Sequence, residues 1–107
     1  MRIAATIIAL TVAASAAPAF AQGERLTDVE YLQAARCAGL VSSDALGATD
    51  SASMEAFMKA QSRGRASFIV DKADQIAATA KRSAKRAAGQ HRASLVAERE
   101  ACARYAG

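Results

Sequence analysis

The sequence predicts an all-α fold, and three observations support this prediction. Alanine, the residue with the highest intrinsic helix propensity, is abundant throughout the chain. No stretch alternates apolar and polar residues with a strand-like period of two, and no Asn-Gly or Asp-Gly pair marks a hairpin. Pro18 is the last proline, so none interrupts a helix after it. We expect a small domain of three helices, at residues 28–41, 52–87 and 91–105, held by one disulfide bond and preceded by a signal peptide.

The first 21 residues have the features of a secretory signal peptide. Arg2 gives a positive start, an apolar run follows over residues 3–14, and the Ala19-Phe20-Ala21 stretch after Pro18 is a small-x-small cleavage site. The run is shorter than the roughly 20 residues that span a bilayer, so we expect cleavage after Ala21. A retained membrane anchor is the alternative. This interpretation places residues 22–107, as a single domain, in the periplasm or outside the cell.

The segment after the predicted cleavage site remains basic. Arg2 is the one charged residue among the first 21, so 13 basic and 10 acidic side chains remain and the formal net charge falls from +4 to +3. An exported chain meets little nucleic acid. The anions available to it in a bacterial envelope are lipid head groups, lipopolysaccharide and cell-wall polymers.

The first helix is predicted over residues 28–41. Thr27 suits the N-cap position, and Glu30 three residues later completes a capping box. An apolar stripe follows at helical spacing; its members are Tyr31, Ala34, Ala35, Ala38 and Val41, widened by Leu32 and Leu40.

The second helix is predicted over residues 52–87, after a loop rich in serine, aspartate and glycine at residues 42–49. Asp50 or Ser51 can cap it. Its first positions on one face follow the i, i+3, i+4, i+7 spacing of a helix; they are Met54, Phe57, Met58 and Gln61. Gly64 costs about 1 kcal/mol relative to alanine within a helix, and we interpret it as a possible kink.

The cysteines require the chain to reverse direction. Cys37 and Cys102 are the two cysteines, and an even number in a small exported domain predicts a disulfide. A straight helix from Met54 would place Cys102 about 72 Å away, beyond the roughly 45 Å that the connection from Cys37 can reach. A turn near Gly89 would bring the cysteines together and start a third helix over residues 91–105. A disulfide between two chains is the alternative.

A basic face is predicted on the helix that contains KRSAKRAAGQHR, residues 81–92. On a helical wheel the cations lie opposite the alanines; the candidate anion-binding face comprises Lys81, Arg82, Lys85, Arg86 and Arg92. Its simplest interpretation is a solvated surface, and the alternative is contact with anionic membrane or polymer. No aromatic side chains interleave with the cations to stack on bases, so we expect no nucleic-acid partner.

His91, the one histidine, falls on the alanine side of the wheel, where a partly buried structural role is expected. A haem held between His91 and Met54 or Met58 is a less favoured alternative. Zinc prefers four ligands, and His91 with Glu98 supplies two at most. The chain contains no recognisable nucleophile motif and no glycine-rich phosphate loop. We therefore predict no cofactor, no metal and no enzymatic activity.

The stretch Leu26-Thr27-Asp28-Val29-Glu30 resembles the L-T-x-x-Q motif of the small helical periplasmic stress proteins, a family of chaperones and metal-resistance proteins. Glu30 stands where that family has glutamine. Size, helicity and one disulfide also make the chain similar in outline to acid-activated periplasmic chaperones. The resemblance implies no site residue. We expect a non-enzymatic interaction or stress-related protein with protein partners or anionic envelope components as ligands; the oligomeric state is open.

Overall fold

The computed structural model describes residues 24–47 and 49–106, which form helices and connecting loops and contain no strand. The elements are α1 (Asp28–Val41), the 3₁₀ turn η1 (Asp44–Leu46), α2 (Ala52–Ser62), α3 (Ser67–Arg86), α4 (Gly89–Ala101) and the short α5 (Ala103–Ala106). The predicted all-α class is confirmed. The predicted signal peptide, residues 1–21, lies outside the described residues.

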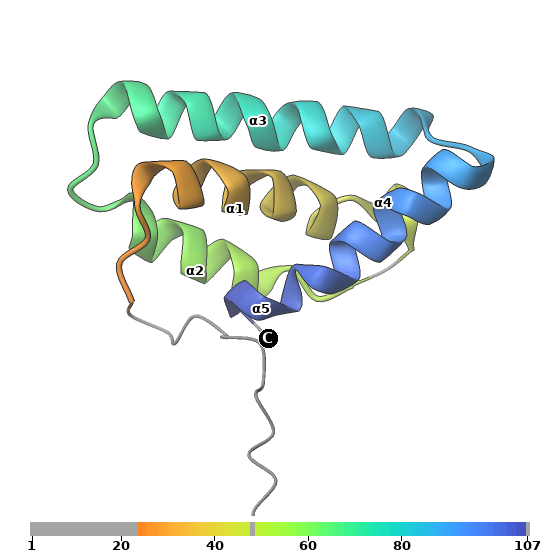
Figure 1. The fold of residues 1–107 in the computed structure, drawn as a ribbon, viewed down its shortest axis with the longest axis horizontal. Helices are drawn as coiled ribbons and strands as arrows, with labels where there is room; N and C mark the ends of the chain where they lie inside the picture. Colours follow the sequence, from red (N-terminus) through yellow and green to blue (C-terminus); the bar gives the residue numbers. More distant parts are fainter. Residues whose placement is uncertain (1–23, 48, 107) are drawn as a thin grey trace, which may run out of the picture.

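α1 is the central helix and packs against α2, α3 and α4. α3 runs along one side of α1, whereas α2 and the α4–α5 segment lie on the other side (Figure 1). The chain reverses between α1 and α2 and again between α2 and α3, so α1 and α3 run in the same direction; a further reversal leads from α3 into α4. α3 is consequently an outer layer, with one face toward α1 and the remainder facing solvent.

The predicted capping box at the start of α1 is confirmed. The Glu30 backbone N–H donates to Thr27 Oγ1 at 3.2 Å, and the Thr27 N–H donates to Glu30 Oε1 at 3.1 Å. Hydrogen bonding with the Thr27 side chain and, second, with its backbone lowers the pKa of Glu30. The predicted bounds of this helix, residues 28–41, are also confirmed.

The prediction of one helix over residues 52–87 is wrong. Residues 63–66 separate α2 from α3, and Gly64 adopts φ 77°, a left-handed conformation that favours glycine. Gly64 therefore helps to end the helix instead of kinking it. A continuous helix would carry the alanine-rich face of α3 away from α1. The observed reversal instead packs α3 along α1 and buries Ala73 and Ala80.

The reversal expected near Gly89 is confirmed. Ala87 and Ala88 are extended, and Gly89 begins α4 with φ 56°. The third helix predicted over residues 91–105 begins two residues earlier and is interrupted at Cys102, so the structure has α4 and α5 in its place.

Cys37 in α1 and Cys102 at the end of α4 form the predicted disulfide. Their Cα atoms are 5.6 Å apart although the residues are 65 positions apart in the sequence. The first helix and the last helical segment are thereby joined, as the positions of the cysteines predicted.

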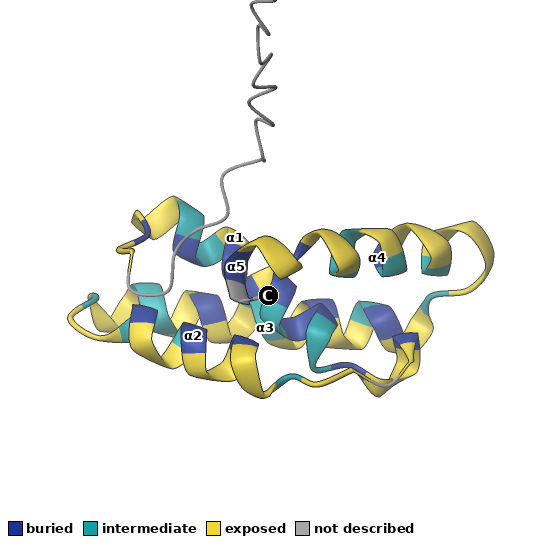
Figure 2. Ribbon diagram, turned by 90° about the horizontal axis from the view of Figure 1, so that it is seen from below, coloured by how far each residue is buried: buried dark blue, intermediate teal, exposed yellow. Residues whose placement is uncertain are grey.

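The core consists of two clusters of buried side chains. The larger cluster surrounds the disulfide; it contains Leu26, Tyr31, Ala34, Ala35, Met54, Phe57, Ala73 and Tyr105. The smaller cluster comprises Leu40, Leu46, Ala80, Ala84 and Leu95. Buried residues lie where helices face one another, and most of the remaining helix surface is exposed (Figure 2).

The contact between α1 and α3 is close because its residues are small. A Cβ atom added to Gly39 would lie 2.2 Å from the Ala77 carbonyl oxygen and 2.9 Å from Ala80 Cβ. Glycine at this position therefore allows the backbones of the two helices to approach each other.

Candidate functional site

The C-terminal half of α3 carries a cluster of exposed cations, which we call the α3 basic cluster: Lys81, Arg82, Lys85 and Arg86. Within residues 24–47 and 49–106, the two ion pairs are Arg36–Glu98 and Arg65–Asp28, and neither involves this cluster. Arg82 Nη2 donates to Thr79 Oγ1 at 3.3 Å. No acidic residue occurs in the sequence between Asp74 and Glu98. Positive charge is therefore concentrated along this half of α3, and Asp44 of η1, which packs against α3, is an acidic residue from a neighbouring element.

Packing of α3 determines where these cations lie. Ala73, Ala80 and Ala84 are buried on the face toward α1, so the basic side chains between and after them point to solvent. Lys85 and Arg86 also lie in the last turn, where cations interact favourably with the helix dipole. The helix is thus amphipathic, but its apolar face is already covered by the fold.

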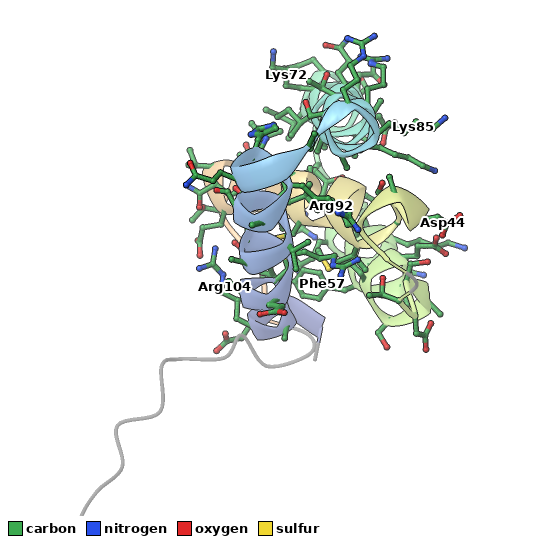
Figure 3. The ribbon with its side chains drawn as sticks, turned by 90° about the vertical axis from the view of Figure 1, so that its right-hand side faces the viewer. Asp44, Phe57, Lys72, Lys85, Arg92 and Arg104 are labelled. Atoms are coloured by element: carbon green, nitrogen blue, oxygen red, sulfur yellow. A yellow bond between two sulfur atoms is a disulfide. The ribbon has the colours of Figure 1, made fainter. Side chains whose placement is uncertain are left out.

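Arg92, the fifth residue of the predicted face, is separated from the α3 basic cluster. It lies in α4, and its Nη1 donates to the Ala45 carbonyl oxygen at 2.6 Å. Arg99 lies seven residues further along α4 and similarly donates from Nη1 to the Gly47 carbonyl oxygen at 2.8 Å. Figure 3 shows Lys72 and Lys85 on the outer helix and Arg92 below them. Arg92 therefore fastens α4 to the loop that contains η1.

His91 is exposed, so the expected partial burial on the alanine side is wrong. Because Ala87 and Ala88 are extended, α4 has an axis and a rotational phase that differ from those of α3. A single helical wheel assumes one continuous helix and therefore places His91 on the wrong side. Met54 packs in the cluster that contains Cys102. Cys102 itself lies about 16 Å from His91 along the axis of α4. The geometry does not favour the haem alternative.

The described residues contain no group of three or more His, Cys, Asp or Glu side chains that could hold a metal ion. In the same part of the chain, no helix has both the length and the apolar character needed to cross a membrane.

A cleft of about 410 Å³ lies between the end of α1, the start of α2 and the end of α4. It is lined by Val41, Thr49, Asp50, Ser53, Met54, Arg99, Glu100, Cys102 and Ala103. Asp50 Oδ1 accepts from the Ala52 N–H at 2.9 Å, whereas Ser51 occupies the N-cap position of α2 and makes no side-chain capping bond. The lining includes a serine and two carboxylates but no histidine, so it lacks the general base of a serine nucleophile.

A buried polar cluster that the sequence analysis did not identify joins the start of the described chain to α2. Gln61 is 4% exposed; its Oε1 accepts from the Leu26 N–H at 3.0 Å and its Nε2 donates to the Glu24 carbonyl oxygen. The Arg65 side chain is also 4% exposed and donates to the Leu26 carbonyl oxygen and to Asp28 Oδ1, both at 2.7 Å. These contacts hold residues 24–28 against the end of α2.

The Arg65 guanidinium also lies over the Tyr31 ring, 4.4 Å from its centroid. Burial, and second the charge of Asp74, raises the pKa of Tyr31, whereas the charge of Arg65 opposes this rise. The cluster is structural in character, because every polar atom that it buries has a partner within the described residues.

Replacement of the Arg65 side chain tests this cluster. Arg65→Gln is expected to lower the free energy of unfolding by about 2 kcal/mol, because the Leu26 carbonyl oxygen loses its donor in a buried site. It should also raise the pKa of Tyr31 further, since the opposing charge is removed. Urea unfolding measures the first effect, and tyrosinate absorbance during an alkaline titration measures the second.

The sign of the pH dependence follows from the raised pKa of Tyr31. Unfolded tyrosine ionises near pH 10, so stability is fully present below about pH 10 and falls as the pH rises from there toward the folded-state pKa. This fall should extend further in Arg65→Gln. Arg63→Gln, at the exposed neighbouring cation, is the control; an equal effect there would refute the role of Arg65.

The chain has no significant match among protein-family models, curated protein sequences or solved structures. Function must therefore be inferred from the residues and their geometry.

Proposed function

We propose that this chain is a small, exported, non-enzymatic interaction protein that binds anionic lipid surfaces of the cell envelope through the α3 basic cluster. The observation that carries the proposal is the exposure of four cations on one outer helix, none of them in an ion pair within residues 24–47 and 49–106. The predicted signal peptide supports the envelope as the place of action.

The electrostatic attraction between the α3 basic cluster and an anionic membrane is large enough to support binding. A lysine or arginine held close to an anionic membrane surface contributes about 1 kcal/mol, and the attraction decays within a Debye length of about 10 Å at 0.1 M salt. Four cations on a rigid helix can approach one surface together, because the fold already fixes their relative positions. Binding should therefore be reversible and weakened by salt.

Burial of the alanine face determines how α3 would bind. Interfacial helices that insert lengthwise use an exposed apolar face rich in Trp, Phe or Leu. The apolar face of α3 is covered by α1, and Ala73, Ala80 and Ala84 are at most 2% exposed. The basic cluster would consequently adsorb to head groups without unpacking the helix from the domain.

A matched pair of charge reversals tests the proposal. Arg82→Glu with Arg86→Glu is expected to reduce co-sedimentation with vesicles of phosphatidylglycerol and phosphatidylethanolamine by at least tenfold, since about 1 kcal/mol is lost for each cation near the surface. The control is Lys59→Glu with Arg63→Glu, which changes net charge equally at exposed sites on α2 and after it.

Retention of binding by the control and loss by the first variant would support the proposal. Equal loss in both would show that net charge alone governs binding, and unchanged binding in both would refute a role for the α3 basic cluster. Circular dichroism of each variant verifies that helicity is preserved.

A further inference from the structure

One edge of α3 presents a stripe of exposed residues that begins with an aromatic side chain and ends with cations. We call it the α3 edge: Phe68, Lys72, Gln75, Thr79, Arg82 and Arg86. Successive members are three or four positions apart, so at 3.6 residues per turn they lie within an arc of about 80°. The stripe is about 27 Å long. It shares Arg82 and Arg86 with the α3 basic cluster and continues from them toward the start of the helix.

The α3 edge borders a groove against α1. A cavity of about 290 Å³ is lined by Arg36 of α1 and by Lys72, Gln75, Ile76 and Thr79 of α3. Val29 and Arg36 are exposed and seven residues apart, and therefore lie on the same face of α1. The α1 side of the groove thus also starts with an apolar residue, and it continues to Arg36, whose charge is paired with Glu98 of α4.

The register of the two helices places their exposed apolar residues level with each other. Gly39 lies against Ala77 and Ala80, and α1 and α3 run in the same direction. With an equal rise per residue, Val29 lies level with a position near Phe68. Val29 is 66% exposed and Phe68 is 70% exposed; among the described residues these two are the large hydrophobic side chains that are exposed.

We propose that this edge of the α1–α3 layer is the membrane-docking face, with Phe68 and Val29 entering the interfacial region of the bilayer while Lys72, Arg82 and Arg86 contact phosphate head groups. The inference rests on the proposed function and gives the bound domain a defined orientation. Apolar residues in line with cations match the chemistry of an anionic bilayer surface, where head groups lie directly above acyl chains.

Charge favours a lipid surface over a second copy of this chain. Two α3 edges brought together would place the cations of one copy near those of the other, which is unfavourable. Asp71 and Asp74 are exposed acidic residues of α3 beside the stripe, and Glu98 of α4 is paired with Arg36, which lines the groove. The cationic end of the edge has no such neighbour in α3.

Tryptophan fluorescence tests the orientation directly, because the chain contains no tryptophan. Phe68→Trp is expected to show a blue-shifted emission when anionic vesicles are added, and brominated acyl chains should quench it. Ala60→Trp, at an exposed position of α2 on the other side of α1, is the matched control and should show neither effect. Phe68→Ala should weaken vesicle binding by about tenfold through the loss of one buried aromatic side chain.

The outcomes separate this inference from the proposed function. If both tryptophan variants bind vesicles and the emission of Phe68→Trp does not shift, the docking face is refuted while lipid binding stands. If neither variant binds, both proposals fail. A blue shift of Phe68→Trp that depends on protein concentration without vesicles would show self-association and would also overturn the docking face.

Discussion

Reduction of the Cys37–Cys102 disulfide is expected to lower the free energy of unfolding by about 4 kcal/mol, because the bond closes a long loop and restricts the unfolded chain. The effect is large relative to the stability of so small a domain, which is typically 5–15 kcal/mol and here rests on an alanine-rich core. The midpoint of thermal unfolding should fall by roughly 20 °C. Circular dichroism with and without a reductant provides the measurement.

The double variant Cys37→Ala with Cys102→Ala is the control for this prediction. It should unfold like the reduced protein and should not respond to reductant. The oxidised wild-type protein should migrate as a monomer on a non-reducing gel. A disulfide-linked dimer, or a loss of less than 1 kcal/mol on reduction, would contradict the role given to this bond.

Gly39→Val is expected to lower the free energy of unfolding by about 3 kcal/mol, because the new side chain would overlap the Ala77 carbonyl oxygen. The nearest obstacle is backbone, so α1 and α3 must move apart and lose contact along their length. Gly39→Ala should have a smaller effect, since higher helix propensity returns about 1 kcal/mol. Denaturant unfolding of both variants measures the graded loss.

Two further variants sharpen the Gly39 prediction. Gln33→Ala, at an exposed position of the same helix, should change stability by less than about 0.5 kcal/mol. Ala80→Gly should not rescue Gly39→Val, because it removes a Cβ atom but leaves the Ala77 carbonyl oxygen in place. Full rescue would mean that side-chain crowding, and not the close approach of the backbones, limits this position.

Local signals in the sequence predicted α1 well and the break after α2 poorly. The capping box of Thr27 and Glu30 is formed by residues three positions apart, so its evidence is contained within one helical turn. The break at Gly64 depends on α3 packing against α1, a contact between distant segments. Propensity alone cannot distinguish a glycine that kinks a helix from one that ends it.

The candidate site likewise could be predicted within one helix but not between helices. Helical spacing correctly grouped the cations of the α3 basic cluster, which lie on one element. It did not separate Arg92 from them, because the extended residues Ala87 and Ala88 change the phase between α3 and α4. Gln61 offered a signal that could have been used, since it occupies a buried position in an otherwise apolar stripe. No local sequence pattern indicates that Val29 and Phe68 lie at the same height, because their relative position depends on the register between α1 and α3.

The central claim, that the domain binds an anionic lipid surface, is tested most directly with the oxidised wild-type protein and two vesicle types. Binding is measured by co-sedimentation with anionic and with zwitterionic vesicles, at about 0.05 M and about 0.5 M salt, between which the screening length falls severalfold. The account predicts strong binding to anionic vesicles at low salt, release at high salt and much weaker binding to zwitterionic vesicles. Absence of binding to anionic vesicles at low salt, or equal binding to both vesicle types, would contradict it.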